Sequence, residues 1–204
     1  MINERLQEWG RVQARRAAEW IRWTGLTPNA LTIIGLLLNC IVAVILGQGY
    51  LLLGGILVLG AGLFDLLDGA MARITGQITP FGSFLDSTLD RYSEVILYGG
   101  LLFYIIGTPD ARVGTLLIHL TICGSIMVSY ARARAESLGY KLQVGLLARP
   151  ERIIILAAGL ILGHPLWALW LLAIFTNVTT IQRIYHLWST TTQAARKSTA
   201  DSGQ

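Results

Sequence analysis

Charged residues are scarce in this chain of 204 residues. Asp, Glu, Lys and Arg make up only 14% of it, well below the ~25% that is usual in soluble domains. Apolar residues make up 53%, and the mean hydropathy is +0.57. This balance excludes an ordinary soluble domain and predicts an integral membrane protein.

Cysteine is scarce as well, with two residues in the whole chain. Cys40 and Cys123 both lie inside apolar runs, so we interpret them as packing residues and exclude a disulfide framework or a cysteine metal site. The N-terminal segment is arginine-rich and lacks an apolar stretch followed by a small-residue cleavage site. We therefore expect no cleavable signal peptide.

Long apolar segments fill most of the chain. Most of them approach the ~20 residues that a helix needs to cross a bilayer, and none shows the alternation typical of a membrane β-barrel. The sequence predicts an all-α membrane protein with six transmembrane helices. The fifth segment is short and spans only if it begins near Arg149. The six segments are residues 30–46, 51–72, 84–106, 113–133, 153–162 and 166–188.

Basic residues gather before the first segment, around the second and fourth connections, and after the last segment. The positive-inside rule then places both termini in the cytoplasm, with the same side bearing the active site. We expect a multi-pass cell-membrane protein. Its net charge of +4 favours contact with anionic lipid headgroups over nucleic acid, because the basic residues lie at membrane edges.

Three regions are predicted along the chain. Residues 1–24 alternate apolar and charged side chains as an amphipathic juxtamembrane helix does; packing on the protein's own cytoplasmic face explains that pattern equally well. Residues 25–188 form the six-helix domain. Residues 189–204 are rich in Ser and Thr and are expected to be a disordered cytoplasmic tail.

Four aspartates interrupt the apolar pattern. Asp65 and Asp68 are three residues apart, and Asp86 and Asp90 are four apart, so each pair shares one face of its helix. The connection between the two helices is short, which makes them antiparallel neighbours whose carboxylates converge. Carboxylates inside a membrane are costly and usually line a wet cavity or bind a cation. Four together suit two ions of Mg²⁺ or Mn²⁺.

Small residues and an arginine accompany these aspartates. Gly69, Ala72 and Gly82 remove side-chain bulk beside them, and Arg73 supplies a cation suited to phosphate. A metal site with this surrounding indicates a nucleotide diphosphate as ligand.

The pattern Asp65-x-x-Asp68-Gly69-x-x-Ala72-Arg73, followed by Gly82-x-x-x-Asp86-x-x-x-Asp90, resembles the signature of the CDP-alcohol phosphotransferases. All its positions are filled between residues 65 and 90. The resemblance implies that a CDP-linked lipid donates its phosphatidyl group to an alcohol and releases CMP. It implies metal binding by Asp65, Asp68, Asp86 and Asp90, with Asp90 as the general base. The implied CDP-lipid site comprises Asn29, Thr32, Asp68, Gly69, Ala72, Arg73 and Gly82.

A second group of cations bears on the acceptor. Arg132, Arg149, Arg152 and Arg183 lie near the predicted cytoplasmic ends of the last three helices. Arginines beside a metal site suit a phosphorylated alcohol, although cytoplasmic anchoring of the helices is the alternative explanation. The runs Ser129–Glu136 and Arg149–Arg152 resemble those of the branch that makes phosphatidylinositol phosphate. That resemblance implies inositol 1-phosphate as acceptor and these four arginines as its phosphate site; family resemblance also implies a homodimer.

Other functions remain open from the sequence. Glycerol 3-phosphate is the main alternative acceptor, since that branch shares the fold. An intramembrane prenyltransferase also binds a diphosphate through aspartates, but it normally has two distant motifs. A non-enzymatic cation carrier would use an acidic site without requiring Gly69, Ala72, Arg73 or Gly82.

Overall fold

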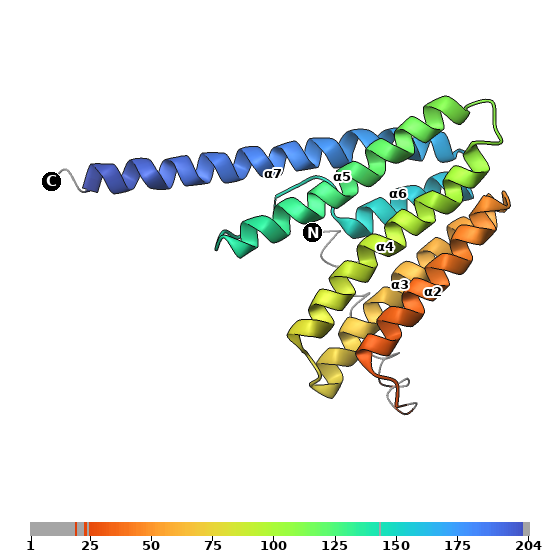
Figure 1. Ribbon diagram of the computed structural model, residues 1–204, viewed down its shortest axis with the longest axis horizontal. Helices are drawn as coiled ribbons and strands as arrows, with labels where there is room; N and C mark the ends of the chain where they lie inside the picture. The colour runs from red at the N-terminus through yellow and green to blue at the C-terminus, as the bar shows by residue number, and fades with distance from the viewer. Residues whose placement is uncertain (1–18, 20–22, 24, 143, 202–204) are drawn as a thin grey trace.

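A computed structural model describes residues 19, 23, 25–142 and 144–201, and within these ranges the regular structure is entirely helical. The prediction of an all-α protein is confirmed. Six helices in this part of the chain follow one another up and down (Figure 1), each antiparallel to the one before it. They are α2 (Pro28–Gly47), α3 (Leu51–Thr75), α4 (Pro80–Ile105), α5 (Ala111–Ser137), α6 (Arg149–Ile161) and α7 (Pro165–Asp201).

Two of these helices begin with the same local signal. Thr27 precedes Pro28 at the start of α2, and Thr79 precedes Pro80 at the start of α4. Each threonine hydroxyl accepts a hydrogen bond from a backbone N–H of the first turn, at 3.2 Å in α2 and 3.0 Å in α4. Proline fits the first helical position because its missing N–H is not needed there. Gly76 ends α3 with a left-handed φ of 68°, as glycine at a helix terminus commonly does.

The helices pack in two groups. α2, α3 and α4 lie together, α5 lies along α7, and α6 lies between α3 and α7 (Figure 1). α2 and α4 come close together at Gly100, where a Cβ would overlap the Ala43 carbonyl oxygen and lie 2.6 Å from the Ala43 carbonyl carbon and Cα. Leu46, Leu101, Leu117 and Leu160 belong to the buried core that joins the two groups.

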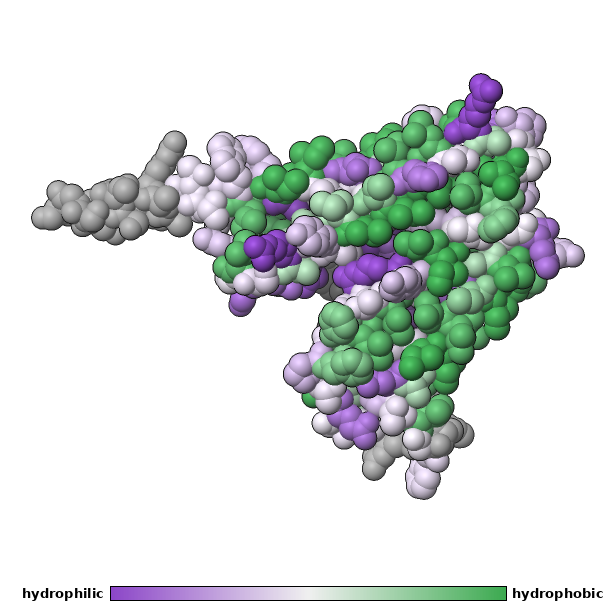
Figure 2. Space-filling model, in the orientation of Figure 1, coloured by the Kyte–Doolittle hydropathy of each residue, from purple (hydrophilic) through white to green (hydrophobic). Residues whose placement is uncertain are grey.

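The outer surface is mostly apolar (Figure 2), and hydrophilic side chains gather in the recess between the two groups of helices. Within the described ranges, four helices are long and apolar enough to cross a membrane: α2, α3, α5 and the part of α7 from Pro165 to Gln193. This agrees with an integral membrane protein. α4 is long enough but carries four charged side chains between Asp86 and Glu94, and α6 has only 13 residues. The length of α6 is therefore about 20 Å, whereas the hydrocarbon core of a bilayer is ~30 Å thick.

The structure bears on the predicted C-terminal tail but hardly on the predicted N-terminal helix. The tail from Ser189 was predicted to be disordered, whereas α7 continues as a helix to Asp201. The hydroxyls of Thr190, Thr191 and Thr192 bond back to carbonyl groups three or four residues earlier, and alanines, the best helix formers, follow. The predicted amphipathic helix of residues 1–24 lies almost wholly outside the described residues.

Candidate active site

All seven residues predicted to bind the CDP-linked lipid line one cavity of about 210 Å³. Its walls come from the start of α2, the second half of α3 and the start of α4. The cavity therefore lies beside two helix N-termini, whose free N–H groups and partial positive charge favour phosphate. Asp86 lines it too, together with residues that the sequence analysis did not select: Pro28, Gln77, Ile78, Thr79 and Ser83.

Small residues shape this cavity. A Cβ at Gly82 would lie 3.0 Å from the Thr79 hydroxyl and 3.1 Å from the Asn29 side chain. A Cβ at Gly69 would meet only the Arg73 guanidinium, at 3.6 Å. These glycines leave room for a ligand between α3 and α4, which is the role expected from their lack of side chain.

The four aspartates converge from α3 and α4. Asp68 is 7% exposed and accepts a hydrogen bond of 2.8 Å from the Thr32 hydroxyl of α2. Asp86 is near enough to the other three carboxylates to interact with them electrostatically. Asp65 packs against α2 at Gly35, where a Cβ would come within 2.9 Å of its carboxylate. Gly35 thus gives Asp65 its space, a role that the sequence did not reveal.

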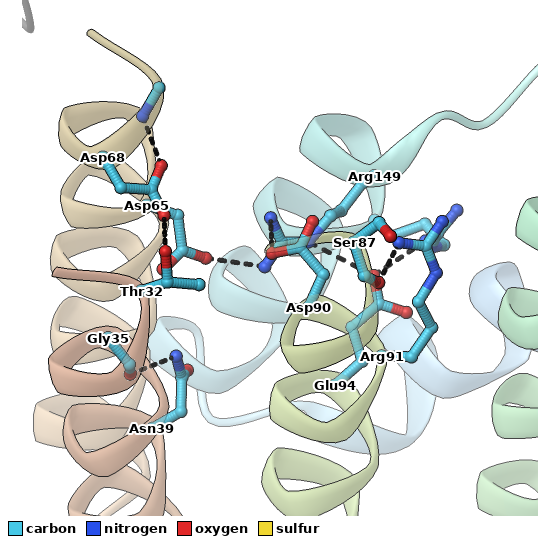
Figure 3. A network of polar contacts seen from close by, with 12 residues as sticks. Thr32, Gly35, Asn39, Asp65, Asp68, Ser87, Asp90, Arg91, Glu94 and Arg149 are labelled. Carbon is cyan, nitrogen blue, oxygen red and sulfur yellow. Dashed lines mark hydrogen bonds and ion pairs between the residues drawn. The ribbon is translucent and has the colours of Figure 1, made fainter. Parts of the chain in front are cut away.

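Arg149, at the start of α6, joins the two aspartate pairs (Figure 3). Its Nη2 lies 2.6 Å from Asp65 Oδ2 and its Nη1 lies 2.8 Å from Asp90 Oδ1. These are charge-assisted contacts of the strongest kind. Arg149 was predicted for the acceptor phosphate, and the structure places its guanidinium between two predicted metal ligands.

Glu94 is a charged residue of the site that the sequence analysis missed. It lies one helical turn after Asp90, and its Oε1 is 2.7 Å from Arg152 Nη2 and 3.8 Å from Arg149 Nε. The signal was present in the sequence, because Asp86, Asp90 and Glu94 recur every four residues and so share one face of α4. Predicted acceptor residues Arg149 and Arg152 thus meet at a single carboxylate.

The other two predicted acceptor arginines have different partners. Arg183 is buried and donates hydrogen bonds to the backbone carbonyls of Val144, at 2.9 Å, and Val128. Arg132 is half-exposed and pairs with Glu136 at 2.9 Å along α5. Arg132, Arg152 and Arg183 are near enough for their charges to interact. Arg183 thus lies near Arg132 and Arg152, while Arg149 and Arg152 share an ion-pair partner in Glu94.

A divalent cation fits the donor chemistry of the four aspartates, since hard oxygen ligands suit Mg²⁺ and Mn²⁺. Among the described residues, however, no three acidic, histidine or cysteine side chains form a ready group of metal ligands. Three of the aspartates have protein partners: Arg149 contacts Asp65 and Asp90, and Thr32 donates a hydrogen bond to Asp68. A metal ion that used Asp65 Oδ2 and Asp90 Oδ1 would displace Arg149 from these two atoms.

The apolar helices and the cavity beside the aspartates agree with a membrane protein that binds a phosphate-containing ligand, and comparison with known proteins identifies the family. The sequence model of the CDP-alcohol phosphatidyltransferases matches residues 25–186. The chain belongs to that family, as the signature predicted.

Two archaeal relatives are similar over most of their length. The archaetidylinositol phosphate synthase of Methanothermobacter thermautotrophicus is 39% identical over 194 residues, covering 92% of this chain and 96% of the relative. That of Pyrococcus horikoshii is 43% identical over 163 residues, covering 79% and 83%. A bacterial relative, the phosphatidylinositol phosphate synthase of Mycobacterium marinum, is 39% identical over 175 residues, covering 81% and 75%. The predicted resemblance to this branch is confirmed.

Solved structures of the same branch share the fold. The crystal structure of the phosphatidylinositol phosphate synthase of Mycobacterium tuberculosis with CDP-DAG bound superposes with a TM-score of 0.80, at 34% identity, covering 86% of this chain and 93% of that one. A structure of the same enzyme in complex with manganese and citrate gives a TM-score of 0.78, at 33% identity, covering 86% and 88%.

Proposed function

We propose that this chain transfers the phosphatidyl group of CDP-diacylglycerol to a hydroxyl of inositol 1-phosphate, giving phosphatidylinositol phosphate and CMP. One observation carries the proposal: the cavity lined by the predicted CDP-lipid residues borders an aspartate cluster that Arg149 connects to Glu94, which also pairs with Arg152. The activities for which the relatives are named support the same transfer.

The first role proposed for the aspartates is metal binding. Asp65, Asp68, Asp86 and Asp90 are proposed to hold a divalent cation, with two ions of Mg²⁺ or Mn²⁺ as the full complement. Such ions, when bound, offset the charge of the diphosphate and stabilise the departing CMP. The manganese complex of a relative supports a divalent cation.

Asp90 is the proposed general base. The acceptor oxygen forms a bond to the lipid-side phosphorus, the bond from that phosphorus to the CMP oxygen breaks, and the hydroxyl proton passes to Asp90. Its position favours this role, because it lies on the side of the cluster facing Arg149 and Glu94 (Figure 3), away from the CDP-lipid cavity. A carboxylate so placed can accept a proton from a positioned hydroxyl.

The acceptor phosphate is proposed to bind Arg132, Arg149, Arg152 and Arg183. Arginine is suited to this because its planar guanidinium can donate two parallel hydrogen bonds to phosphate. Arg149 and Arg152 lie next to the aspartates, so a phosphate on them brings the alcohol near Asp90.

We further propose six transmembrane helices in residues 25–188, with α4 and α6 completing the four apolar spans. The charges of α4 face the site, which reduces their cost in a membrane. The basic residues favour cytoplasmic termini and a cytoplasmic active site. The amphipathic juxtamembrane helix of residues 1–24 and a homodimer remain part of this proposal.

The experiment is CMP release by the purified chain. CDP-diacylglycerol is supplied with Mg²⁺, Mn²⁺ or excess EDTA, and with inositol 1-phosphate, glycerol 3-phosphate, free inositol or serine as acceptor. We expect release only with a divalent ion and inositol 1-phosphate. A CDP-linked ether lipid in a parallel series tests the tails of the donor.

The other outcomes are distinct. Release with glycerol 3-phosphate alone assigns the chain to the glycerophosphate branch. Release with free inositol excludes a required phosphate contact. No CMP with any acceptor, together with Mn²⁺ uptake into vesicles containing the protein, indicates the cation carrier instead.

A further inference from the structure

Glu94 carries a negative charge that the proposed transfer does not use. Its side chain is 12% exposed and lies on the same face of α4 as Asp86 and Asp90, one turn farther from the start of the helix. Ionisable groups in such surroundings are usually functional, with a definable partner. Here the partners are two of the arginines proposed for the acceptor phosphate.

The contact with Arg152 fixes that side chain. Arg152 is 3% exposed, and its Nη2 meets Glu94 Oε1 at 2.7 Å. A buried guanidinium is costly without a paired carboxylate. Its Nε is buried and has no hydrogen-bond partner among the described residues, so Arg152 keeps a donor free while Glu94 holds its other end.

The contact of Glu94 with Arg149 links Glu94 to the aspartates. Glu94 lies 3.8 Å from Arg149 Nε, while the two terminal nitrogens of the same guanidinium reach Asp65 and Asp90. One carboxylate therefore holds two cations beside the base. Both arginines belong to the short helix α6, whereas Glu94 belongs to α4, so the ion pairs also fix where the start of α6 lies relative to Asp90.

We propose that Glu94 is a positioning residue for the acceptor: it holds Arg149 and Arg152 so that an acceptor phosphate bound to them places the alcohol at Asp90. Glu94 acts through the arginines and does not touch the substrate. The inference rests on the proposed function, because it requires a phosphorylated alcohol as acceptor.

The two physical effects of Glu94 have opposite signs. Its charge alone repels a phosphate, so an electrostatic role predicts tighter acceptor binding when the charge is removed. Its hold on the arginines predicts weaker binding when the contact is lost. The variant Glu94→Gln keeps the side-chain size and removes the charge, and thus separates the two.

The experiment measures KM for the phosphorylated alcohol that the wild-type protein uses, KM for CDP-diacylglycerol, and kcat. We expect Glu94→Gln to raise the acceptor KM about tenfold or more, and to leave the CDP-diacylglycerol KM within about twofold. Glu94→Asp, which keeps the charge on a shorter side chain, should recover part of the loss. Asp110→Asn is the matched control, because Asp110 is exposed at the N-cap of α5, in the connection that follows the end of α4.

Several results overturn the proposal. One is an acceptor KM that is lowered or unchanged in Glu94→Gln. Another is an equal rise of the KM values for the acceptor and for CDP-diacylglycerol, because a general structural defect would raise both. If Glu94→Gln does not fold, judged by a monodisperse elution and a thermal transition, Glu94→Asp decides by the same comparison of KM values. A wild-type protein that uses no phosphorylated alcohol instead refutes the proposed function.

Discussion

A metal ion bound by the aspartates as proposed would compete with Arg149 for Asp65 and Asp90, and this gives the site a quantitative test. In the change Arg149→Gln, the contacts at 2.6 Å to Asp65 and 2.8 Å to Asp90 are lost. The three side chains are at most 26% exposed, so solvent weakens these contacts little. A charge-assisted hydrogen bond contributes about 1.5 kcal/mol or more.

With the hydrogen bond to Asp65 and the ion pair with Asp90 counted at equal strength, Arg149 opposes metal binding by about 3 kcal/mol, which corresponds to roughly a hundredfold in affinity. In the wild-type protein, part of this cost is recovered, because an Arg149 displaced by the metal can contact other partners such as Glu94. We therefore expect Arg149→Gln to tighten Mn²⁺ binding by about tenfold to a hundredfold. The same change removes a proposed phosphate ligand, so KM for the acceptor should rise. Opposite effects on the two ligands distinguish competition from general damage to the site.

The assay is a titration of the detergent-solubilised protein with Mn²⁺, followed by electron paramagnetic resonance of the free ion. Arg112→Gln, at the exposed start of α5 on the other side of the molecule, is the control and should not change the affinity. Arg149→Lys keeps the charge without the planar fork and should lie between wild type and Arg149→Gln. Unchanged or weaker Mn²⁺ binding in Arg149→Gln would refute competition for Asp65 and Asp90.

Two further changes test the base and the helix packing. Asp90→Asn should keep CDP-diacylglycerol binding but lower CMP release by about a hundredfold or more, the usual contribution of a general base; loss of lipid binding contradicts the assignment. Gly100→Ala should lower the thermal midpoint, with a cost of about 1–3 kcal/mol, because its Cβ meets the Ala43 backbone. Gly99→Ala has open space and should be neutral or stabilising through helix propensity; similar midpoints for both variants argue against this packing.

The part of the site that the sequence predicts well is local. The aspartate pairs and Gly69 to Gly82 all lie within 26 residues on two neighbouring helices, where helical periodicity alone fixes which side chains share a face. The connection between α3 and α4 is short, and it brings the two faces together. The cavity is lined by all the residues predicted for it because each belongs to these helices or to the adjoining start of α2.

The partners of the arginines depend on packing that no local pattern encodes. Arg149 is 84 residues from Asp65 in the sequence, and their contact requires α6 to begin at Arg149 and to lie against α3. An arginine near the membrane edge can bind phosphate, anchor a helix or pair with a carboxylate. Its charge and position in the sequence are the same in all three cases. Arg183 shows the difference: it was predicted from its charge, and its guanidinium is hydrogen-bonded to backbone carbonyls of α5 and the following connection.

Glu94 could be predicted from the sequence only in part, because its role depends on the arginines of α6. Its spacing from Asp90 was visible in the sequence, but its function depends on which cations α6 brings to it. α6 has 13 residues and buries Leu156, Ala157 and Leu160 in the core, whereas the position of its polar start depends on specific contacts. The ion pairs of Arg149 and Arg152 with α3 and α4 supply them at the one end of α6 that borders the aspartates. The same arginines that are proposed to bind the acceptor therefore hold in place the helix that carries them, and loosening them should alter acceptor binding before it alters the CDP-lipid cavity.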